Sequence, residues 1–503
     1  MLMLGSLAAL ALGTAEPLPW QAAFHESSET VAPAQDTNAL LKAYDSAMFG
    51  KRFDEALAIA RKFESAGPEG QAYVAAMQAS ALVGLKRDSE ARALVAKAKE
   101  LASSSPDSSR VMFLGGLLTD RPDVAADALD RMIAIAPDMV RELNWEWIRF
   151  FLGHEPKGQD SRNEDRRIAL ARIGYGGETE VGHWRAANAV DILVKRGDFS
   201  GAGEFLEYVN EPRAFENMLI QRRYAALWSQ LETLAGPHLE KIREASLRSA
   251  RAEYASAPDD HDKLQLLANA LRHAGRFDEA MALRAKLPAT SAEMSLADEP
   301  MGWAVNNVAL AFHEAGRADD ADRLFALLND APMPKEYWRI SMKINRLELL
   351  VMDGKFDQAL PLVEPTAKTE GSPYADQLVR RLRYCTLSSV GRNDEAAKYL
   401  PDLLGHAADA PGPTIDGLLC AGELDKAVQV ALDSLNGEKK DSFAEDFLRQ
   451  LQTHQLTSDD PSVWQGRWQE LRARPAIREA FDRLGRDLPP QLLPPPPTHV
   501  PAK

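Results

Sequence analysis

One short phrase of sequence returns eight times along the chain of 503 residues and limits what the chain can fold into. Its clearest form is the hexapeptide GRFDEA at residues 275–280, which follows an apolar run with helical spacing. Related copies begin at Lys51, Arg87, Gly197, Gly316, Gly354, Gly391 and Gly422. A phrase that recurs at similar intervals predicts one structural unit repeated along the chain.

Each residue type in the phrase helps to end one helix and start the next. Glycine adopts the positive φ that ends a helix without a Cβ clash. The Asp or Ser that follows can cap the next helix, and acidic residues in a first turn suit the helix dipole. The closing alanine lets the two helices approach closely. The phrase therefore predicts a helical hairpin and carries no catalytic chemistry.

The spacing of the phrase gives the size of the repeat. Its closing alanines at positions 280, 321, 359, 396 and 427 are 41, 38, 37 and 31 residues apart, and Ala56 and Ala91 are 35 apart. In the spacing of the phrase and in its order of residue types, the chain resembles the tetratricopeptide repeat family, whose units of 34 residues are helix–turn–helix hairpins. In the copy around Gly316, the family's large apolar, alanine and aromatic positions hold Phe312, Ala321 and Phe325.

The resemblance implies an all-α fold, a right-handed α-solenoid of tetratricopeptide-like repeats that ends in C-terminal capping helices. Apolar residues between Trp464 and Leu484 recur at helical spacing and fit such a cap, whereas seven prolines from Pro489 onward predict an extended tail. We expect a signal peptide over 1–15, a linker over 16–37, N-terminal repeats over 38–102, degenerate helical repeats over 103–260, C-terminal repeats over 261–436, capping helices over 437–488 and a Pro-rich disordered tail over 489–503.

The middle of the chain departs most from the repeat pattern. Four aromatic residues between Trp145 and Phe151 form a cluster that we interpret as core. Pro122 and the alanines at 125 and 126 indicate a worn copy of the turn. The stretch GYGG at 174–177 lacks the Gly-Lys-Ser/Thr ending of a phosphate-binding loop, so we expect a bent loop between repeats.

Several kinds of chemistry find no support in the sequence. The formal charge is −15, from 74 acidic and 59 basic residues, which disfavours a nucleic-acid partner. No stretch of 18 apolar residues predicts an integral membrane segment. No His-Glu-x-x-His helix, Gly-x-Ser-x-Gly elbow or set of metal ligands is present, so we expect no metal, no cofactor and no enzyme activity.

The N-terminus and the two cysteines concern the compartment. Residues 1–12 are almost wholly apolar, and small residues precede a cleavage position after Ala15, as in a secretory signal, although a basic segment before the apolar run is missing. We expect a periplasmic or secreted protein, with a cytoplasmic location as the alternative.

Cys385 and Cys420 lie 35 residues apart, about one repeat. We expect two free buried thiols; the alternative is a disulfide, formed if the chain is exported.

In the tetratricopeptide family, the first helices of successive repeats line a concave groove that holds a partner. Carrying the groove positions onto this chain gives Asn188, Asp191, Gln265, Asn269, Arg272, His273, Asn306, His313, Asn345, Glu348, Arg381 and Ser388. Amide and guanidinium groups suit peptide backbones and carboxylates. The resemblance thus implies a non-catalytic scaffold or adaptor that binds a protein or peptide in the bacterial cell envelope. The alternatives are a cytoplasmic regulatory or accessory subunit of an enzyme, and a helical-repeat enzyme with an unrecognised site.

Overall fold

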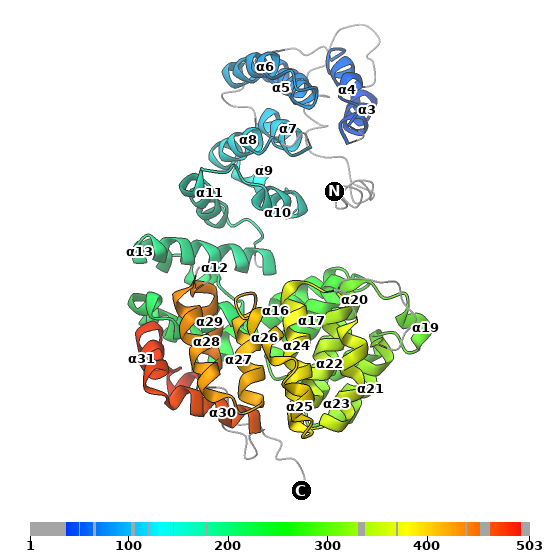
Figure 1. The fold of residues 1–503 in the computed structure, drawn as a ribbon. Coiled ribbons are helices and arrows are strands. Elements are labelled where there is room, and N and C mark those ends of the chain that lie inside the picture. The colour runs from blue at the N-terminus through cyan, green and yellow to red at the C-terminus, as the bar shows by residue number, and fades with distance from the viewer. Residues whose placement is uncertain are drawn as a thin grey trace. The chain divides into compact units, whose positions relative to one another are not determined.

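The computed structural model describes residues 37–49, 51–63, 67–101, 106–118, 121–143, 145–177, 179–329, 338–368, 371–437, 440–452 and 463–493. Within these ranges the secondary structure is helical, apart from one isolated β-bridge (Figure 1). This confirms the predicted all-α fold of stacked helical hairpins. The expected signal peptide over 1–15 and linker over 16–37 lie outside the described residues, except for Thr37, which begins the first described helix. The chain divides into two compact units, Met1–Gly177 and Glu178–Lys503.

Unit 1 consists of helical hairpins that stack through their first helices, since α5 packs on both α6 and α7 and α7 packs on α8. Its helices are α3 (Thr37–Phe49), α4 (Phe53–Ala60), α5 (Gly67–Gly84), α6 (Asp88–Leu101), α7 (Pro106–Leu118), α8 (Pro122–Ile135), α9 (Pro137–Arg141), α10 (Trp145–Gly153) and α11 (Asp160–Arg172).

Unit 2 starts with short and irregular helices and continues with regular hairpins. The first part contains α12 (Glu180–Lys195), α13 (Phe199–Gly203), η1 (Leu206–Tyr208), α14 (Pro212–Ile220), η2 (Arg222–Leu227), α15 (Trp228–Ala235), η3 (Pro237–Leu239) and α16 (Glu240–Ser256). The hairpins are formed by α17 (His261–His273), α18 (Phe277–Ala282), η4 (Leu283–Lys286), α19 (Ser291–Met294), α20 (Glu299–Glu314), α21 (Ala318–Asn329), α22 (Arg339–Met352), α23 (Phe356–Ala367), α24 (Pro373–Ser389), α25 (Asn393–Ala396), α26 (Leu400–Gly405), α27 (Pro411–Cys420) and α28 (Leu424–Asn436). The unit ends with α29 (Lys440–Gln450), α30 (Val463–Ala473), α31 (Pro475–Leu484) and η6 (Pro490–Leu492).

The repeated phrase forms the same turn wherever it occurs. In each of the eight copies, a backbone N–H after the turn donates to the carbonyl five residues earlier, as from Arg276 to Leu271 at 2.9 Å and from Arg317 to Phe312 at 2.8 Å. This bond defines a Schellman motif at the end of the first helix. The predicted positive φ is confirmed at Gly197, Gly275, Gly316, Gly354, Gly391 and Gly422. The closing alanines are buried in all eight copies.

Two details of the predicted turn are wrong. In the copies near residues 51 and 87, the left-handed residues are Lys51 and Lys86, and Gly84 instead ends α5 against the ring of Phe53. Among the caps, Asp198 accepts a hydrogen bond from the N–H of Gly201. In other copies the N-cap position holds a basic residue such as Arg276, and the acidic residue two positions later, such as Asp278, lies inside the first turn and caps nothing, so it acts through the helix dipole alone.

The irregular middle follows the sequence in part. Tyr175, inside the glycine-rich turn at 174–177, is buried, and its hydroxyl donates to the carbonyl of Leu143. This confirms the predicted loop. Within the aromatic cluster, Phe151 is fully buried against the edge of Phe113. The predicted degenerate segment 103–260 contains the boundary between the two units.

The C-terminal helices do more than cap the last repeat, because they bind the beginning of unit 2. Gly485 and Gln221 form an antiparallel bridge, and the N–H of Arg486 donates to the carbonyl of Ile220 at 2.9 Å. The Arg486 guanidinium also donates to the carbonyl of Leu219 at 2.8 Å and stacks on Trp228. Leu492 is buried, so the predicted tail does not begin at Pro489: residues 489–493 are packed against the unit. Unit 2 is thereby closed on itself.

Candidate functional site

The first helices of unit 2 place polar side chains on a shared surface, which we call the inner surface. We assign to it residues of α12, α14, α16, α17, α20, α22, α24, α27 and α29. His273 on α17 lies within electrostatic range of Arg213 on α14, although α16 packs between these two helices. Tyr374 on α24 similarly interacts electrostatically with Asp446 on α29, although α27 packs against both of these helices. Helices that are not neighbours therefore face the same space.

Half of the predicted groove residues are used to join successive first helices. Arg272 of α17 binds Glu314 of α20 at 2.7 Å. Asn345 of α22 donates to Asn306 of α20 at 2.7 Å. The ring of His313 meets Asp353, just past the end of α22, at 2.7 Å. These pairs form a ladder across the repeats, so these predicted residues are engaged in contacts between helices.

The remaining predicted residues have varied surroundings. Asp191 accepts hydrogen bonds from Tyr224 at 2.9 Å and contacts Arg223 at 3.2 Å. The Oδ1 atom of Asn188 is buried and has no hydrogen-bond partner among the described residues. Gln265 and Ser388 are half-buried. Asn269 and His273 line a small cavity and are the predicted residues most available to a ligand.

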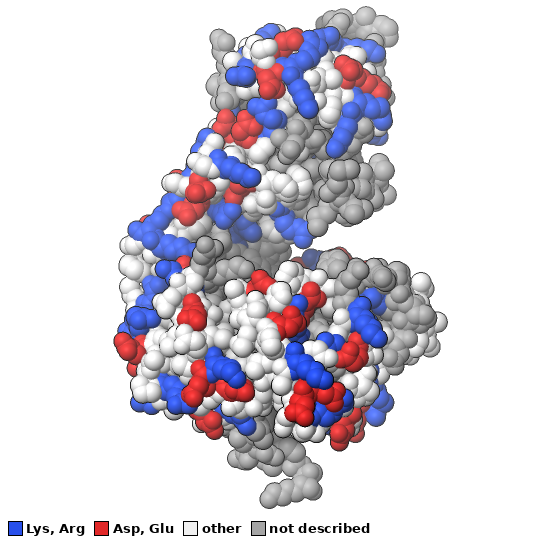
Figure 2. Space-filling model, viewed as in Figure 1, with Lys and Arg blue, Asp and Glu red and all other residues white. Residues whose placement is uncertain are grey.

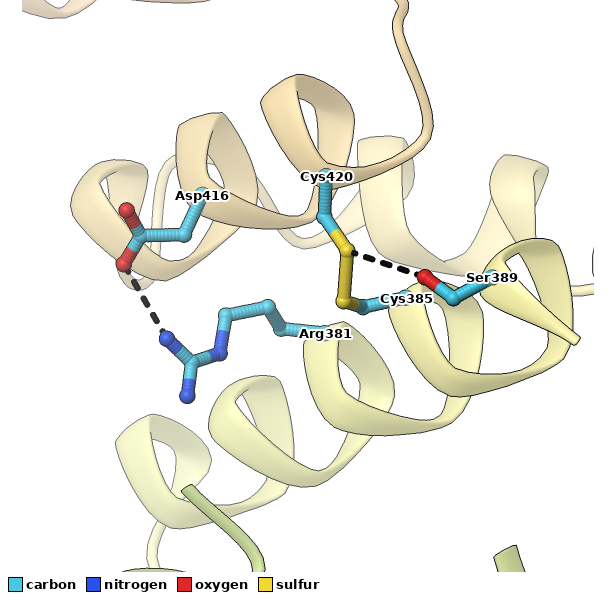
Figure 3. Close-up of a disulfide and its surroundings, with 5 residues drawn as sticks. All are labelled: Arg381, Cys385, Ser389, Asp416 and Cys420. Atoms are coloured by element: carbon cyan, nitrogen blue, oxygen red, sulfur yellow. Dashed lines mark hydrogen bonds and ion pairs between the residues drawn. A yellow bond between two sulfur atoms is a disulfide. The ribbon is translucent and has the colours of Figure 1, made fainter. Parts of the chain in front are cut away.

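The strongest ionic cluster of the inner surface surrounds Arg381. Its guanidinium donates to Glu348 of α22 at 2.5 Å and to Asp416 of α27 at 3.2 Å (Figure 3). The second oxygen of Asp416 accepts a hydrogen bond from the indole of Trp468 at 3.0 Å. Desolvation raises the pKa of Asp416 to about 6, even though Arg381 acts to lower it. The cluster is therefore a buried structural element, and Arg381 is not an exposed clamp.

A disulfide lies one helical turn from this cluster. Cys385 of α24 is bonded to Cys420 of α27, with their Cα atoms 5.4 Å apart, in the usual range for a disulfide (Figure 3). The expectation of two free thiols is thus wrong, because the two cysteines form a disulfide. Successive first helices pack closely enough at this point to bring residues one repeat apart into bonding distance. The disulfide joins the same two helices as the Arg381–Asp416 pair.

Several residues of the inner surface were not predicted. Burial raises the pKa of the Glu216 carboxyl, against the opposing effect of Arg243 and two other arginines. Desolvation and nearby arginines lower the pKa of His273 to about 4, so its ring is neutral at pH 7. Tyr374 is 54% exposed. Glu216 and Arg243 lie on α14 and α16, where no copy of the turn phrase gives the register of the helices.

Unit 1 has a separate polar cluster and a cavity. The side chain of Arg166 is fully buried and binds Asp130 at 2.5 Å, and it also bonds Asn163. A cavity of about 520 Å³ lies between α6, α7 and α8, lined in part by Ser108, Met112 and Ala128. Since α6 and α8 belong to successive hairpins that stack through α5 and α7, these second helices diverge and leave the space.

The surface of unit 2 carries charged side chains of both signs. On the visible face of unit 2, acidic and basic side chains are interspersed (Figure 2). Among the described residues, no three His, Cys, Asp or Glu side chains are grouped so as to hold a metal ion. None of the described helices is both long and apolar enough to cross a bilayer.

The fold and the inner surface define an all-α helical-repeat protein. No family model matches the sequence, and no curated protein matches it. Its structure is similar to a chain of the solved complex of Naa15 and Naa10 bound to HypK-THB, at 14% sequence identity and a TM-score of 0.21. The similarity covers 89% of this chain and 80% of that chain. Because the TM-score is so low, no function of that complex is carried over.

Proposed function

We propose that this protein is a non-catalytic scaffold of the tetratricopeptide type that binds a protein or peptide segment on the inner surface of unit 2. The observation that carries the proposal is that helices far apart in the chain meet at this surface, as where Arg213 of α14 lies 3.6 Å from Asp446 of α29. A surface built in this way offers both charge signs and an exposed aromatic side chain to one bound segment. Aromatic side chains are prominent among the residues that dominate protein interfaces.

Photo-crosslinking at Tyr374 tests this proposal. A benzoylphenylalanine at position 374 replaces one aromatic side chain by another and should give discrete adducts with a partner in cells. The same residue at Leu296, which is 86% exposed in the segment between α19 and α20, is the matched control. The Tyr374→Ala variant should bind the captured partner about tenfold or more weakly, with unchanged stability, because the side chain is exposed. Identical adducts from both positions would contradict the proposal.

We further propose that the chain acts in an oxidising compartment, the periplasm or outside the cell. The Cys385–Cys420 disulfide supports this location, since disulfides persist mainly in oxidising compartments. The apolar N-terminal residues followed by small residues also support export.

Cell fractionation with N-terminal sequencing tests the location. We expect the mature chain in the exported fraction to begin at Glu16, after cleavage behind Ala15. Alkylation of living cells before lysis should leave both cysteines unmodified, because they are bonded. Recovery of an intact Met1 in the cytosol, with both thiols alkylated, would overturn export.

A further inference from the structure

A small polar cavity opens on the inner surface of unit 2, beside two of the predicted groove residues. It has a volume of about 50 Å³, enough for a few water molecules or for one small polar group. Its walls come from α12, the segment before α14, α16 and α17. Two histidines line it: His273 is exposed to solvent, whereas His183 is 5% exposed.

His183 has one ring nitrogen in use and one without a partner. Its Nδ1 atom lies 3.0 Å from the carbonyl oxygen of Tyr208. Because a carbonyl can only accept a hydrogen bond, Nδ1 carries the hydrogen, and Nε2 of the neutral ring is an acceptor. Nε2 is buried, and no group of the described residues bonds to it. A buried acceptor of this kind is costly unless a water molecule or a ligand satisfies it.

Two of the other residues of the cavity wall are carboxylates. Glu253 is held by Lys263 at 2.8 Å and by the hydroxyl of Ser249, so its position is fixed. Glu211 accepts a hydrogen bond from the N–H of Ala214. The amides of Asn210 and Asn269 and the hydroxyls of Ser246 and Ser249 complete the polar lining. Oδ1 of Asn269 accepts a hydrogen bond from Arg272 at 3.5 Å, whereas no Lys or Arg lines the cavity itself. His273 adds no charge at pH 7, because its pKa is lowered to about 4.

Three arginines lie near enough to the cavity to help lower the pKa of His273, and each also has an acidic neighbour. Arg272 is bound to Glu314 at 2.7 Å, and Arg213 lies 3.6 Å from Asp446. Arg243 interacts electrostatically with Glu216. The cavity therefore favours a hydrogen-bond donor at Nε2 of His183, and the Glu211 carboxylate in its wall favours a positively charged one.

We propose that this cavity binds a primary ammonium group of the partner, either its N-terminal amine or a lysine side chain, with Nε2 of His183 as one acceptor. The inference rests on the proposed function, and it assigns the chemistry of one subsite within the binding surface. An ammonium group has three hydrogens, and one of them can bond to the unpartnered Nε2 of His183. Charge-assisted hydrogen bonds to it are stronger than neutral ones, which gives the subsite a means of selecting its ligand.

Binding of the full-length protein to peptide libraries on beads tests the inference. Three libraries of random octapeptides are compared: one with a free N-terminus and no lysine, one acetylated with a single lysine, and one acetylated without lysine. We expect the third library to bind at least tenfold more weakly than the better of the other two. Whichever of those two binds more tightly identifies the source of the ammonium group.

Two substitutions at His183 make the test specific to the cavity. His183→Asn keeps a donor for the Tyr208 carbonyl and removes the acceptor, so it should lose at least tenfold in binding. His183→Gln places an amide oxygen near the position of Nε2 and should retain part of the affinity. His406→Asn, at an exposed histidine held by Asp409, should bind as the unmodified protein does.

The outcomes separate this inference from the proposed function. Equal binding of all three libraries, or full binding by His183→Asn, would overturn the ammonium subsite while peptide binding stands. Absence of binding to every library would overturn the proposed function and this inference with it.

Discussion

Replacement of both cysteines, Cys385→Ala with Cys420→Ala, should lower the free energy of unfolding by about 4 kcal/mol. The disulfide closes a loop of 35 residues. In the chain-entropy model, closing a loop of this length lowers the entropy of the unfolded chain enough to stabilise the folded state by about 4 kcal/mol. Denaturant unfolding of the double variant and of the unmodified protein measures the difference. A reducing agent should shift the unmodified protein to the same midpoint and leave the double variant unchanged.

Coincident midpoints for the two proteins would contradict the stabilising role of the disulfide. The reductant provides the internal control, because it removes the bond without changing the side-chain volume. The position of the bond adds to its expected effect. It holds α24 against α27 beside the ionic cluster of Arg381, so loss of the bond should also loosen that cluster.

The second large decrease in the free energy of unfolding is expected from Arg381→Ala. The side chain of Arg381 is 10% exposed, and its removal leaves the carboxylates of Glu348 and Asp416 without their shared partner. Breaking a buried ion pair on one side typically costs about 3–5 kcal/mol. Arg380→Ala is the matched control, since the adjacent Arg380 pairs with a more exposed Asp402 and such a surface pair contributes about 1 kcal/mol or less.

The loss caused by Arg381→Ala should depend on pH. The pKa of Asp416 is already raised to about 6 in the folded protein, above its ordinary value, and removal of Arg381 raises it further. The folded state then holds a proton that the unfolded state has released, so the stability decreases as the pH rises through this range. Unfolding at pH 5 and pH 8 should show the smaller loss at pH 5. A larger loss of stability at pH 5 than at pH 8 would show that the Asp416 carboxyl is not the group responsible.

The sequence predicts this fold well wherever the determining interaction is local. The Schellman turn at Gly275 depends on residues within five positions of one another, and the buried Ala280 depends on the adjacent helix. The inner surface is harder to predict, because Asn306 and Asn345 meet only when two first helices have a definite register. A family pattern indicates which helix faces inward, but it does not tell whether a polar side chain is paired.

The interactions that sequence reasoning missed are those that join distant parts of the chain. Arg486 donates to a carbonyl 267 residues earlier, and no periodic signal marks either residue. The proline-rich composition after Pro489 favours an extended tail, yet Leu492 is buried because a surface formed much earlier in the chain receives it. Glu216 and Arg243 were missed for a related reason, since their helices lack the turn phrase.

The bridge between Gln221 and Gly485 also bears on how this protein can change in evolution. An open array of repeats can gain or lose a unit at its end, because only one neighbour is affected. In unit 2 the last segment is paired with the first, so an added hairpin would separate Gly485 from Gln221 and expose Leu488 and Leu492. Variation should therefore accumulate as substitutions within existing hairpins and as changes in loop length. The number of hairpins between α14 and α31 should stay constant among its descendants.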